Sequence, residues 1–410
     1  MPEDIKPGAK PFNVGGVQLD QPFKIRRLGH FGVDVHDMEV SLPWYTENFG
    51  IKTSDPIDFG ARLPPDQIGK HGTGVGYFMR HGTDHHSFVL FPRRVRKQLM
   101  KHYPDKITVN QITWQVGSLR EVVDGTHWLK DVGVKIARTG RDNPGSNWHV
   151  YPLDPEGHTN EIYYGIEQIG WDGLSKPKGM HRRNYHETPS IPHRSENAEI
   201  NEGFADTSVS ILDGWRHTEK SEEKYDVGGI LLGRPFKVTK IGPIRVFAED
   251  VAEMLIFYRD AMGLKVTEEI TWKGHRCIFL RANTEHHSLA IYPLALRAEL
   301  GLSAHSTLFS CGFQVGDYAQ LRNGVDFLKS KGVEIKKLPP ELFPGMDYNA
   351  FAVDPDGHLI QLYYHMEQIG WDGKPMPAAL RPRIHNDTWP ESVSAQNDTF
   401  NGEVFLGPWN

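Results

Sequence analysis

The sequence predicts an α+β fold built from four modules, each with the order strand, helix and three strands (βαβββ). Three observations predict it: the chain repeats itself once, each copy shows the same alternation of strand and helix patterns twice, and turn signals recur at matching places. A length of 410 residues also exceeds what one ordinary core supports. We therefore expect two domains with two modules each.

The repeat extends over most of the chain. Three pairs of segments match between the copies. They are DHHSFVLFP at 84–92 with EHHSLAIYP at 285–293, TWQV at 113–116 with GFQV at 312–315, and EQIGWDG at 167–173 with the same sequence at 367–373. Near the start of each copy the offset is 213 residues, but it falls to 201 at the HHS segment. The second copy is therefore expected to lack twelve residues in the loop before its third strand.

The first module begins with LGHFGVDV (28–35), whose composition predicts a strand. Asp37 is expected to cap a helix that runs to about Asn48 and stops at Gly50. GVGYFMRHG and HHSFVLFP supply the remaining long strands. This gives one complete βαβββ unit.

The second module opens with the strand VNQITWQV (109–116), followed by a capping box from Ser118 to Glu121 on a helix that ends near Gly133. VGVKIAR and a hairpin complete it. In the second copy, the helix caps are Asp250 with Glu253 and Asp317 with Gln320. The four-module plan therefore has a helix start signal in every module.

The hairpin lies in HVYPLDPEGHTNEIYY (149–164) and returns as AFAVDPDGHLIQLYY in the second copy. The Asp-Pro-Glu-Gly sequence predicts a type I turn closed by a glycine bulge. This turn sets Tyr151 opposite Glu161 on one face of the two strands. The second copy has Phe351 and Gln361 at these positions, so it lacks both the phenol and the acid.

Composition excludes several classes of function. A net charge of −6 gives no basic footprint, so nucleic acid is not expected as a partner. No signal-peptide layout and no apolar run near 18 residues is present, so we expect a cytoplasmic protein without membrane contact. Cys277 and Cys311 are the only cysteines and predict neither a disulfide framework nor a thiolate metal site.

Paired units with LGHFGVDV at the start and DPEGHTNEIYY at the end resemble the vicinal oxygen chelate superfamily. That group includes glyoxalases, fosfomycin- and bleomycin-resistance proteins, and type I extradiol ring-cleaving dioxygenases. The resemblance implies that two modules form one open, cupped sheet. We expect a metal-binding domain at 14–173, a linker or arm at 174–226 that could act as a lid or dimer arm, a second domain without metal at 227–373, and a C-terminal arm at 374–410.

The resemblance also implies site residues. His30 stands at the first-strand ligand position and Glu161 at the last-strand carboxylate position. Gln111 stands where extradiol dioxygenases have their second histidine. Tyr151 matches the tyrosine placed beside the substrate, and His86 matches the acid that serves the bound oxygen.

Three positions leave alternatives open. Gln111 offers a weaker donor than histidine for Fe(II), but glyoxalases use a glutamine there together with a ligand from the HHS strand, which here would be His86. Asp142 falls where many dioxygenases carry a further histidine near the substrate. His149 lies on the same face as Tyr151 and is a candidate substrate contact or substitute ligand.

The duplication supplies an internal control. Features in both copies are expected to serve the fold, and features in one copy only are expected to serve chemistry. The pairs that differ are His30 and Pro243, Gln111 and Ser310, Tyr151 and Phe351, and Glu161 and Gln361. We therefore expect the first half to bind metal and the second half to be a structural twin.

The resemblance implies an extradiol-type dioxygenase acting on a catechol or related dihydroxy-aromatic. Fe(II) is the expected metal, with Mn(II) or another divalent ion as the alternative. The expected partners are a small aromatic substrate, O2 and a second copy of the chain. A glyoxalase-like metal-dependent lyase or isomerase is the first alternative, and a non-catalytic binder of aromatic ligands is the second.

Overall fold

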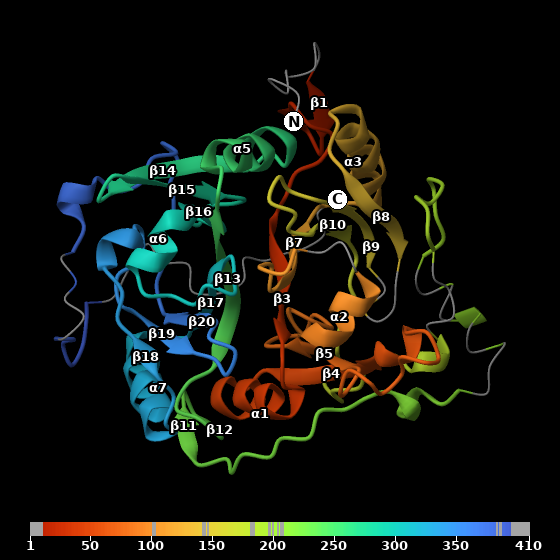
Figure 1. Cartoon of the computed structure of the whole chain (residues 1–410), viewed down its shortest axis with the longest axis horizontal. Coiled ribbons are helices and arrows are strands. Elements are labelled where there is room, and N and C mark those ends of the chain that lie inside the picture. The colour runs from red at the N-terminus through yellow and green to blue at the C-terminus, as the bar shows by residue number, and fades with distance from the viewer. Residues whose placement is uncertain are drawn as a thin grey trace.

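Two eight-stranded sheets lie side by side in the computed structural model, one from each half of the chain (Figure 1). The structure describes residues 11–100, 104–141, 145, 147–180, 185–195, 198, 201–202, 205, 209–382, 384 and 388–394. No helix within these ranges is both long and apolar enough to cross a bilayer. The sheets are mixed, so the predicted α+β class with four βαβββ modules is confirmed.

The first sheet has the order β4-β5-β6-β3-β7-β10-β9-β8. In each of its modules the first strand pairs in parallel with the last, and the two first strands meet antiparallel at the centre. The strands that the site uses are therefore neighbours. The strands are β3 Arg27–Val35, β4 Lys52–Asp58, β5 Val75–Arg80, β6 Phe88–Pro92, β7 Val109–Gln115, β8 Ile136–Arg141, β9 Trp148–Pro152 and β10 Asn160–Tyr164.

The second sheet repeats this order as β14-β15-β16-β13-β17-β20-β19-β18. Its parallel and antiparallel pairings are the same as in the first sheet. The strands are β13 Val238–Ala248, β14 Lys265–Trp272, β15 His275–Arg281, β16 Leu289–Pro293, β17 Leu308–Val315, β18 Ile335–Lys336, β19 Asn349–Val353 and β20 Leu359–Tyr363.

Helix starts follow the predicted caps. The Asp37 carboxylate accepts hydrogen bonds from Glu39 N and Val40 N, and Gly50 ends that helix with φ 70°. The helices are α1 Met38–Phe49, α2 Arg93–Leu99, α3 Leu119–Asp131, α5 Val251–Ile256 continued by a π-helical turn η4 Phe257–Ala261, α6 Leu294–Glu299 and α7 Tyr318–Ser330, with the short 3₁₀ turns η1 Gly60–Arg62, η2 Lys178–Met180, η3 Ile211–Asp213, η5 Pro340–Leu342 and η6 Ala378–Leu380.

Some elements were not predicted. The short helices α2 and α6 follow the HHS strands directly and carry no capping residue. Two small hairpins precede the halves and turn at Gly-Gly pairs, which is a hairpin signal in the sequence. Their strands are β1 Phe12–Val14, β2 Val17–Leu19, β11 Tyr225–Val227 and β12 Ile230–Leu232.

The length difference between the copies falls in the predicted place. In the first half the chain leaves β4 at Asp58 and enters β5 at Val75. In the second half β14 ends at Trp272 and β15 begins at His275. The long loop of the first half therefore has no counterpart in the second.

The DP-x-GH motif shared by both copies joins the two halves. Its hairpin forms as expected: Gly157 has φ 91°, and Val150 pairs with Ile162, a register that sets Tyr151 opposite Glu161. Tyr258 of the second half donates a hydrogen bond to the Asp154 carboxylate at 2.9 Å. Tyr45 of the first half donates to the equivalent Asp354 at 2.8 Å, so the contact is made twice with the roles exchanged.

One continuous core runs through both halves and includes Phe31, Phe49, Phe236 and Phe313. The Phe49 and Phe313 rings pack edge to face with their centroids 5.5 Å apart. Helices α1 and α5 lie at the boundary between the halves, at the bottom and top of Figure 1. Both sheets thus bury one face against the shared core, and their opposite faces differ in what they carry.

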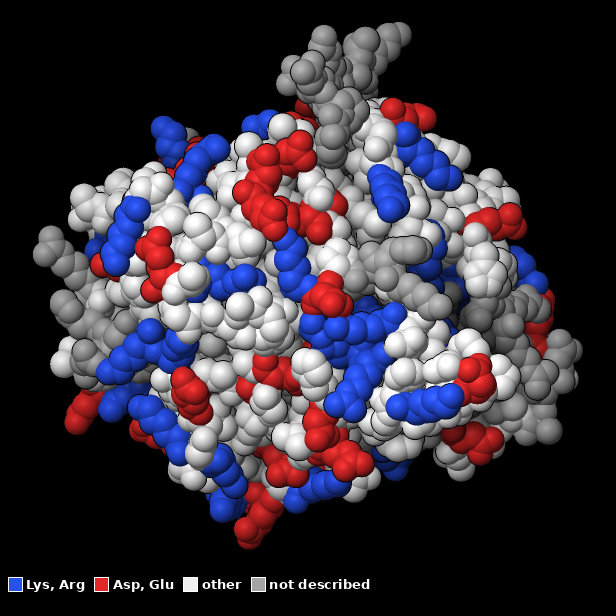
Figure 2. Space-filling view, viewed as in Figure 1, with Lys and Arg blue, Asp and Glu red and all other residues white. Residues whose placement is uncertain are grey.

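Acidic and basic side chains both lie on the face shown in Figure 2, and the net charge of the chain is −6. Basic side chains gather near the centre of the face shown in Figure 2, over the region of α2, whose sequence is RRVRKQL, and acidic side chains are scattered around them.

The segment predicted as a linker or arm contains more local structure than expected. It carries the η2 and η3 turns, and Tyr185 forms a backbone bridge with Arg141 at the edge of the first sheet. The Tyr185 and Trp148 rings lie 4.8 Å apart. The segment therefore packs on the first half, whereas its role as a lid or dimer arm stays a prediction.

Candidate metal centre

The candidate site occupies the concave face of the first sheet, which we call the first cup. His30 on β3 pairs with Thr113 on β7, and Thr113 pairs with Glu161 on β10. These three side chains therefore form one row across three adjacent strands. Gln111 lies two residues before Thr113 and so faces the same side. His30 and Glu161 are both fully buried, with an exposed fraction of 0%.

The Glu161 carboxylate is the centre of the cluster. Its Oε2 lies 3.2 Å from Nε2 of His30 and accepts hydrogen bonds from the Gln111 amide at 3.1 Å and the Thr113 hydroxyl at 3.2 Å. Its Oε1 accepts from the Asn147 amide at 2.6 Å. Every neighbour supplies a donor or an imidazole, so the charge of the acid is compensated from several sides.

This environment sets the protonation state of Glu161. Burial raises the pKa of the carboxyl, but the His30 imidazole beside it outweighs burial, and the pKa falls to about 2. The acid is therefore ionised at neutral pH. A fully buried, ionised carboxylate next to an imidazole is the type of pair that holds a divalent cation.

The donor set fits a divalent metal ion with open positions. Two ligands that are each about 2.1 Å from an ion and at right angles lie about 3 Å apart, close to the 3.2 Å between His30 and Glu161. No group of three or more His, Cys, Asp and Glu side chains in the described part of the chain has metal-ligand geometry. A third protein ligand would therefore be a neutral side chain of another type. Gln111 is the candidate, because rotation of its amide would turn the oxygen toward such an ion.

A chain of hydrogen bonds links His86 through His85 to the Asp55 carboxylate. Nε2 of His85 lies 2.7 Å from the Asp55 carboxylate, and Nδ1 of His85 lies 3.1 Å from Nδ1 of His86. Since the carboxylate can only accept, His85 carries its proton on Nε2 and accepts at Nδ1. His86 therefore carries its proton on Nδ1 and has its lone pair on Nε2.

His86 is also held neutral. Burial is the main cause that lowers its pKa well below the usual value, and the neighbouring His30 and His85 rings lower it further. The His86 ring contacts the His30 ring with centroids 4.3 Å apart. A neutral imidazole with an unprotonated Nε2 beside the candidate metal position is suited to accept a proton from a bound hydroxyl.

A cavity of about 410 Å³ opens over this cluster. Its polar lining includes His86, Gln111, His149, Tyr151 and Glu161, and its apolar lining includes Phe59, Phe78 and Phe91. The Tyr151 ring packs edge to face on His149 at 4.6 Å, and the Arg138 guanidinium lies 4.4 Å from the Tyr151 ring centre. A space of this size with aromatic walls suits a small aromatic ring.

The structure thus brings six of the seven predicted residues together, namely His30, His86, Gln111, His149, Tyr151 and Glu161. Nδ1 of His149 lies 3.7 Å from the Glu161 carboxylate, beyond hydrogen-bond distance. Asp142, the seventh, lies outside the described residues. Five of the six line the cavity, and His30 contacts two of them, His86 and Glu161. The roles of all these residues stay predictions.

Sequence reasoning missed the supporting residues. Thr113 and Asn147 could have been found from strand alternation, since each lies two residues from a predicted site residue. His85 and Asp55 gave no such signal, because they meet only when β4 and the HHS segment are brought together by the sheet.

The equivalent place in the second half, the second cup, is occupied by a side chain. Arg245 takes the sheet position that Gly32 has in the first half, since both pair with the strand-equivalent residues Ser310 and Gln111. Its fully buried guanidinium donates to Gln361 Oε1 at 2.6 Å and to Nε2 of His287 at 2.9 Å. A protein cation thus stands where the first half has the candidate metal position.

Comparison with known proteins agrees with this architecture. The sequence model of the Glyoxalase/Bleomycin resistance protein/Dioxygenase superfamily matches residues 27–162 and 240–362, which are the two sheets. A 2,2',3-trihydroxybiphenyl dioxygenase of Sphingomonas paucimobilis is 22% identical over 130 residues. That match covers 32% of this chain and 42% of the relative, so it spans less than half of that protein.

Solved structures share the fold over nearly the whole chain. A halotolerant catechol dioxygenase superposes with a TM-score of 0.52 at 14% identity and covers 86% of this chain and 91% of its own. The Mn(II)-bound glyoxalase of Novosphingobium aromaticivorans gives 0.52 at 16% identity, with coverage of 93% and 99%. Homoprotocatechuate 2,3-dioxygenase of Brevibacterium fuscum gives 0.54 at 13% identity, with coverage of 91% and 88%. With its two matched segments and its paired βαβββ modules, the chain belongs to the glyoxalase/bleomycin resistance protein/dioxygenase superfamily.

Proposed function

We propose that the protein is an extradiol-type dioxygenase that cleaves a catechol or related dihydroxy-aromatic ring in its first cup. One observation carries the proposal: the ionised Glu161 beside His30, the neutral His86 and the Tyr151 phenol converge on one cavity with aromatic walls. The matched family contains dioxygenases, and the similar structures include ring-cleaving dioxygenases of catechols.

His30, Glu161 and Gln111 would hold the metal, with Fe(II) the first candidate and Mn(II) the second. When bound, such an ion supplies Lewis acidity toward catechol oxygens and electron transfer to O2. The ring opening would break one ring C–C bond and add one oxygen atom of O2 to each of its two carbons, so it needs no external reductant. Glu161 is ionised and fully buried beside His30, so the chain is preorganised for a cation.

The other residues handle the substrate and its protons. The phenyl rings that line the cavity would receive the aromatic ring and exclude water from it. The Tyr151 hydroxyl would orient one substrate hydroxyl. Nε2 of His86 would accept the proton of a substrate hydroxyl and return it when the ring opens, because its tautomer is fixed by His85 and Asp55.

A glyoxalase-like lyase or isomerase is the second candidate. Gln111 favours it, because an amide ligand suits the metals of that chemistry, and a Mn(II)-bound glyoxalase is among the similar structures. In that case Glu161 would move a proton on the substrate and O2 would not be consumed. A non-catalytic binder of aromatic ligands would need no metal. Assembly into a homo-oligomer and a cytoplasmic location stay predictions from the sequence.

The test is anaerobic loading of the full-length protein with Fe(II), with Mn(II) or with no metal, followed by oxygen uptake on a panel of catechols. We expect one equivalent of bound iron or manganese and metal-dependent oxygen uptake with a coloured ring-opened product. Metal binding without oxygen uptake would favour the lyase, and activity without any metal would refute both metal-dependent functions.

The Glu161→Gln variant gives the first half the residue that the second half already has. We expect metal affinity and turnover to fall by more than the roughly 10- to 100-fold that loss of an outer-shell partner costs. Gln361→Glu is the matched control in the second cup, where metal content and turnover should stay at wild-type values. If Glu161→Gln keeps both, the site is placed wrongly.

A further inference from the structure

The wall of the first cavity carries arginine side chains from opposite edges of the first sheet. Arg62 belongs to the η1 turn after β4, Arg138 lies on β8, and both line the cavity of about 410 Å³. In the strand order of this sheet, β4 and β8 are the two ends. Neither arginine takes part in the proposed chemistry, which uses residues at the floor of the cavity. Their guanidinium groups would therefore meet a part of the substrate other than its two hydroxyl groups.

Backbone hydrogen bonds fix the turn that carries Arg62. Phe59 N donates to Gly74 O at 2.9 Å, and Arg62 N donates to Phe59 O at 3.0 Å. The Phe59 ring is buried and packs on the Phe91 ring with centroids 4.2 Å apart. The guanidinium carbon of Arg62 lies 5.0 Å from the centre of the Phe59 ring. The aromatic wall of the cavity therefore holds a charged guanidinium beside it.

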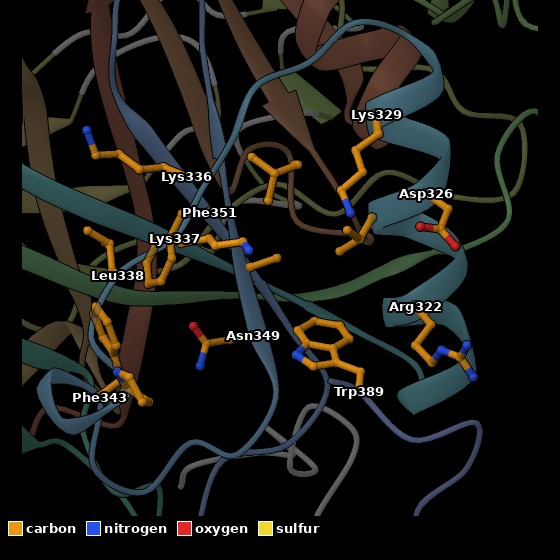
Figure 3. Close-up of a pocket in the computed structure, with 14 residues that line it drawn as sticks. Arg322, Asp326, Lys329, Lys336, Lys337, Leu338, Phe343, Asn349, Phe351 and Trp389 are labelled. Carbon is orange, nitrogen blue, oxygen red and sulfur yellow. The ribbon is translucent and has the colours of Figure 1, made fainter. Parts of the chain in front are cut away.

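This position is occupied in the first half only. Arg62 lies in the loop between β4 and β5, which is twelve residues longer than its counterpart. The second half joins β14 to β15 through Lys273 and Gly274, and neither residue lines the cavity of about 260 Å³ that opens in that half (Figure 3). Because features of one copy are expected to serve chemistry and not the fold, Arg62 is expected to serve the substrate.

A carboxylate is the group that a guanidinium matches best. The planar fork of arginine donates two parallel hydrogen bonds to the two oxygens of a carboxylate. The Glu161 carboxylate lies at the floor of the cavity, where the Gln111 and Asn147 amides donate to it. A ligand carboxylate at the wall would therefore bind Arg62 while the candidate metal position at the floor stays open to the hydroxyl groups.

We propose that the substrate is a dihydroxy-aromatic acid and that Arg62 binds its carboxylate. This inference rests on the proposed function, which assigns the two hydroxyl groups to the metal. The ring lies against the phenyl rings that line the cavity, its hydroxyl groups face Glu161 at the floor, and its carboxylate reaches Arg62 at the wall. Arg62 thus selects an acidic ring over a neutral one and takes no part in the oxygen chemistry.

The experiment compares two catechols that carry a carboxylate at different ring positions, protocatechuate and pyrocatechuate, with neutral protocatechuyl alcohol. Calorimetric titration of the full-length, Fe(II)-loaded protein without O2 gives the affinities, and oxygen uptake gives KM and kcat. We expect one of the acids to bind about tenfold more tightly than the alcohol, because only the acid forms a charge-assisted hydrogen bond with the guanidinium.

Arg62→Gln should remove this preference. The affinity for the acid should fall and its KM rise about tenfold, whereas kcat and the affinity for the alcohol should stay near wild-type values. Arg62→Lys should keep part of the preference, since it retains the charge but loses the planar fork. Arg94→Gln is the matched control, because Arg94 is an exposed arginine of α2 that does not line the cavity. It should bind all three compounds as the wild type does.

Three results would overturn the proposal. They are equal affinity of the wild type for the acids and the alcohol, a preference for an acid that survives Arg62→Gln, and an equal loss of the preference in Arg94→Gln. Absence of oxygen uptake with all three compounds would instead refute the proposed dioxygenase. The titration without O2 would still decide whether Arg62 binds an acid, so the two failures are distinguishable.

Discussion

The two cups have the same strand order but differ in what fills them. The first holds a cavity of about 410 Å³ over polar side chains. The second is filled by a packed cluster that includes Phe247, Phe279, Phe309 and Phe351. The same strand order therefore accommodates either an open cavity or a packed apolar cluster on its concave face.

The cation position makes the comparison sharper. In both halves a pair of histidines is fixed by an acid, which is Asp55 in the first and Glu268 in the second. In the second half the lone pair of His287 Nε2 receives the Arg245 guanidinium. In the described part of the first half, no arginine donates a hydrogen bond to Nε2 of His86. The scaffold thus presents an acceptor to a cation in both cups, and a resident arginine takes that place in one of them.

The loop between β4 and β5 extends the contrast. The loop at residues 59–74 is twelve residues longer than its counterpart in the second half, and two of its residues, Phe59 and Arg62, line the first cavity. The second half replaces this loop with a tight connection between β14 and β15. The longer loop therefore forms part of the wall of the candidate active site.

The largest effect that would test this comparison concerns the histidine pair. His85→Phe removes the acceptor that fixes the His86 tautomer, so we expect kcat to fall roughly 10- to 100-fold while the metal stays bound. Steady-state oxygen uptake and metal analysis on the same samples measure this. The matched variant His286→Phe in the second half should leave kcat unchanged. Equal losses in both variants would mean that the pair serves folding alone.

A smaller effect is expected in the second cup. Arg245→Met removes a buried charge but leaves Gln361, Ser310 and His287 without their donor, so we expect the free energy of unfolding to fall by about 2 kcal/mol. Urea denaturation followed by circular dichroism measures it. Metal content and turnover should remain, because the first cup is untouched. Loss of metal with full stability would contradict a structural role for the second cup.

The smallest effect concerns the contact between the halves. Tyr45→Phe and Tyr258→Phe each remove one hydrogen bond to a buried aspartate, and each should cost about 1–2 kcal/mol of unfolding free energy. Tyr258→Phe should cost the more of the two, because the Tyr258 hydroxyl also accepts a hydrogen bond from the buried Asn160 amide at 3.1 Å. Denaturant melts of the two variants and of the double variant measure this. A larger loss in Tyr45→Phe than in Tyr258→Phe would contradict this order.

Much of the fold was predictable because its signals are local. Asp37, Ser118, Asp250 and Asp317 cap their helices as expected, and the loop difference between the copies falls before the third strand. The strand predicted at 132–138 begins later than expected, at Ile136, and its counterpart in the second half is only two residues long. Edge strands lack a partner on one side, so their limits depend on neighbours that a local pattern does not reveal.

The site was predictable only where one strand carries two of its residues. Tyr151 and His149 follow from alternation along β9, and the hairpin turn sets Glu161 opposite Tyr151. The link from Asp55 through His85 to His86 crosses strands that are far apart in sequence. No spacing rule contains that link, because it depends on which strands become neighbours.

The sequence by itself determined the four modules, the pairing of the two copies and the loss of His30, Tyr151 and Glu161 from the second, because caps, turns and alternation act over a few residues. Tertiary structure alone decided that Arg245 fills the second cup, that His86 carries a free lone pair, and that Arg62 lines the first cavity. These features depend on distances between strands and helices that the chain brings together only when it folds.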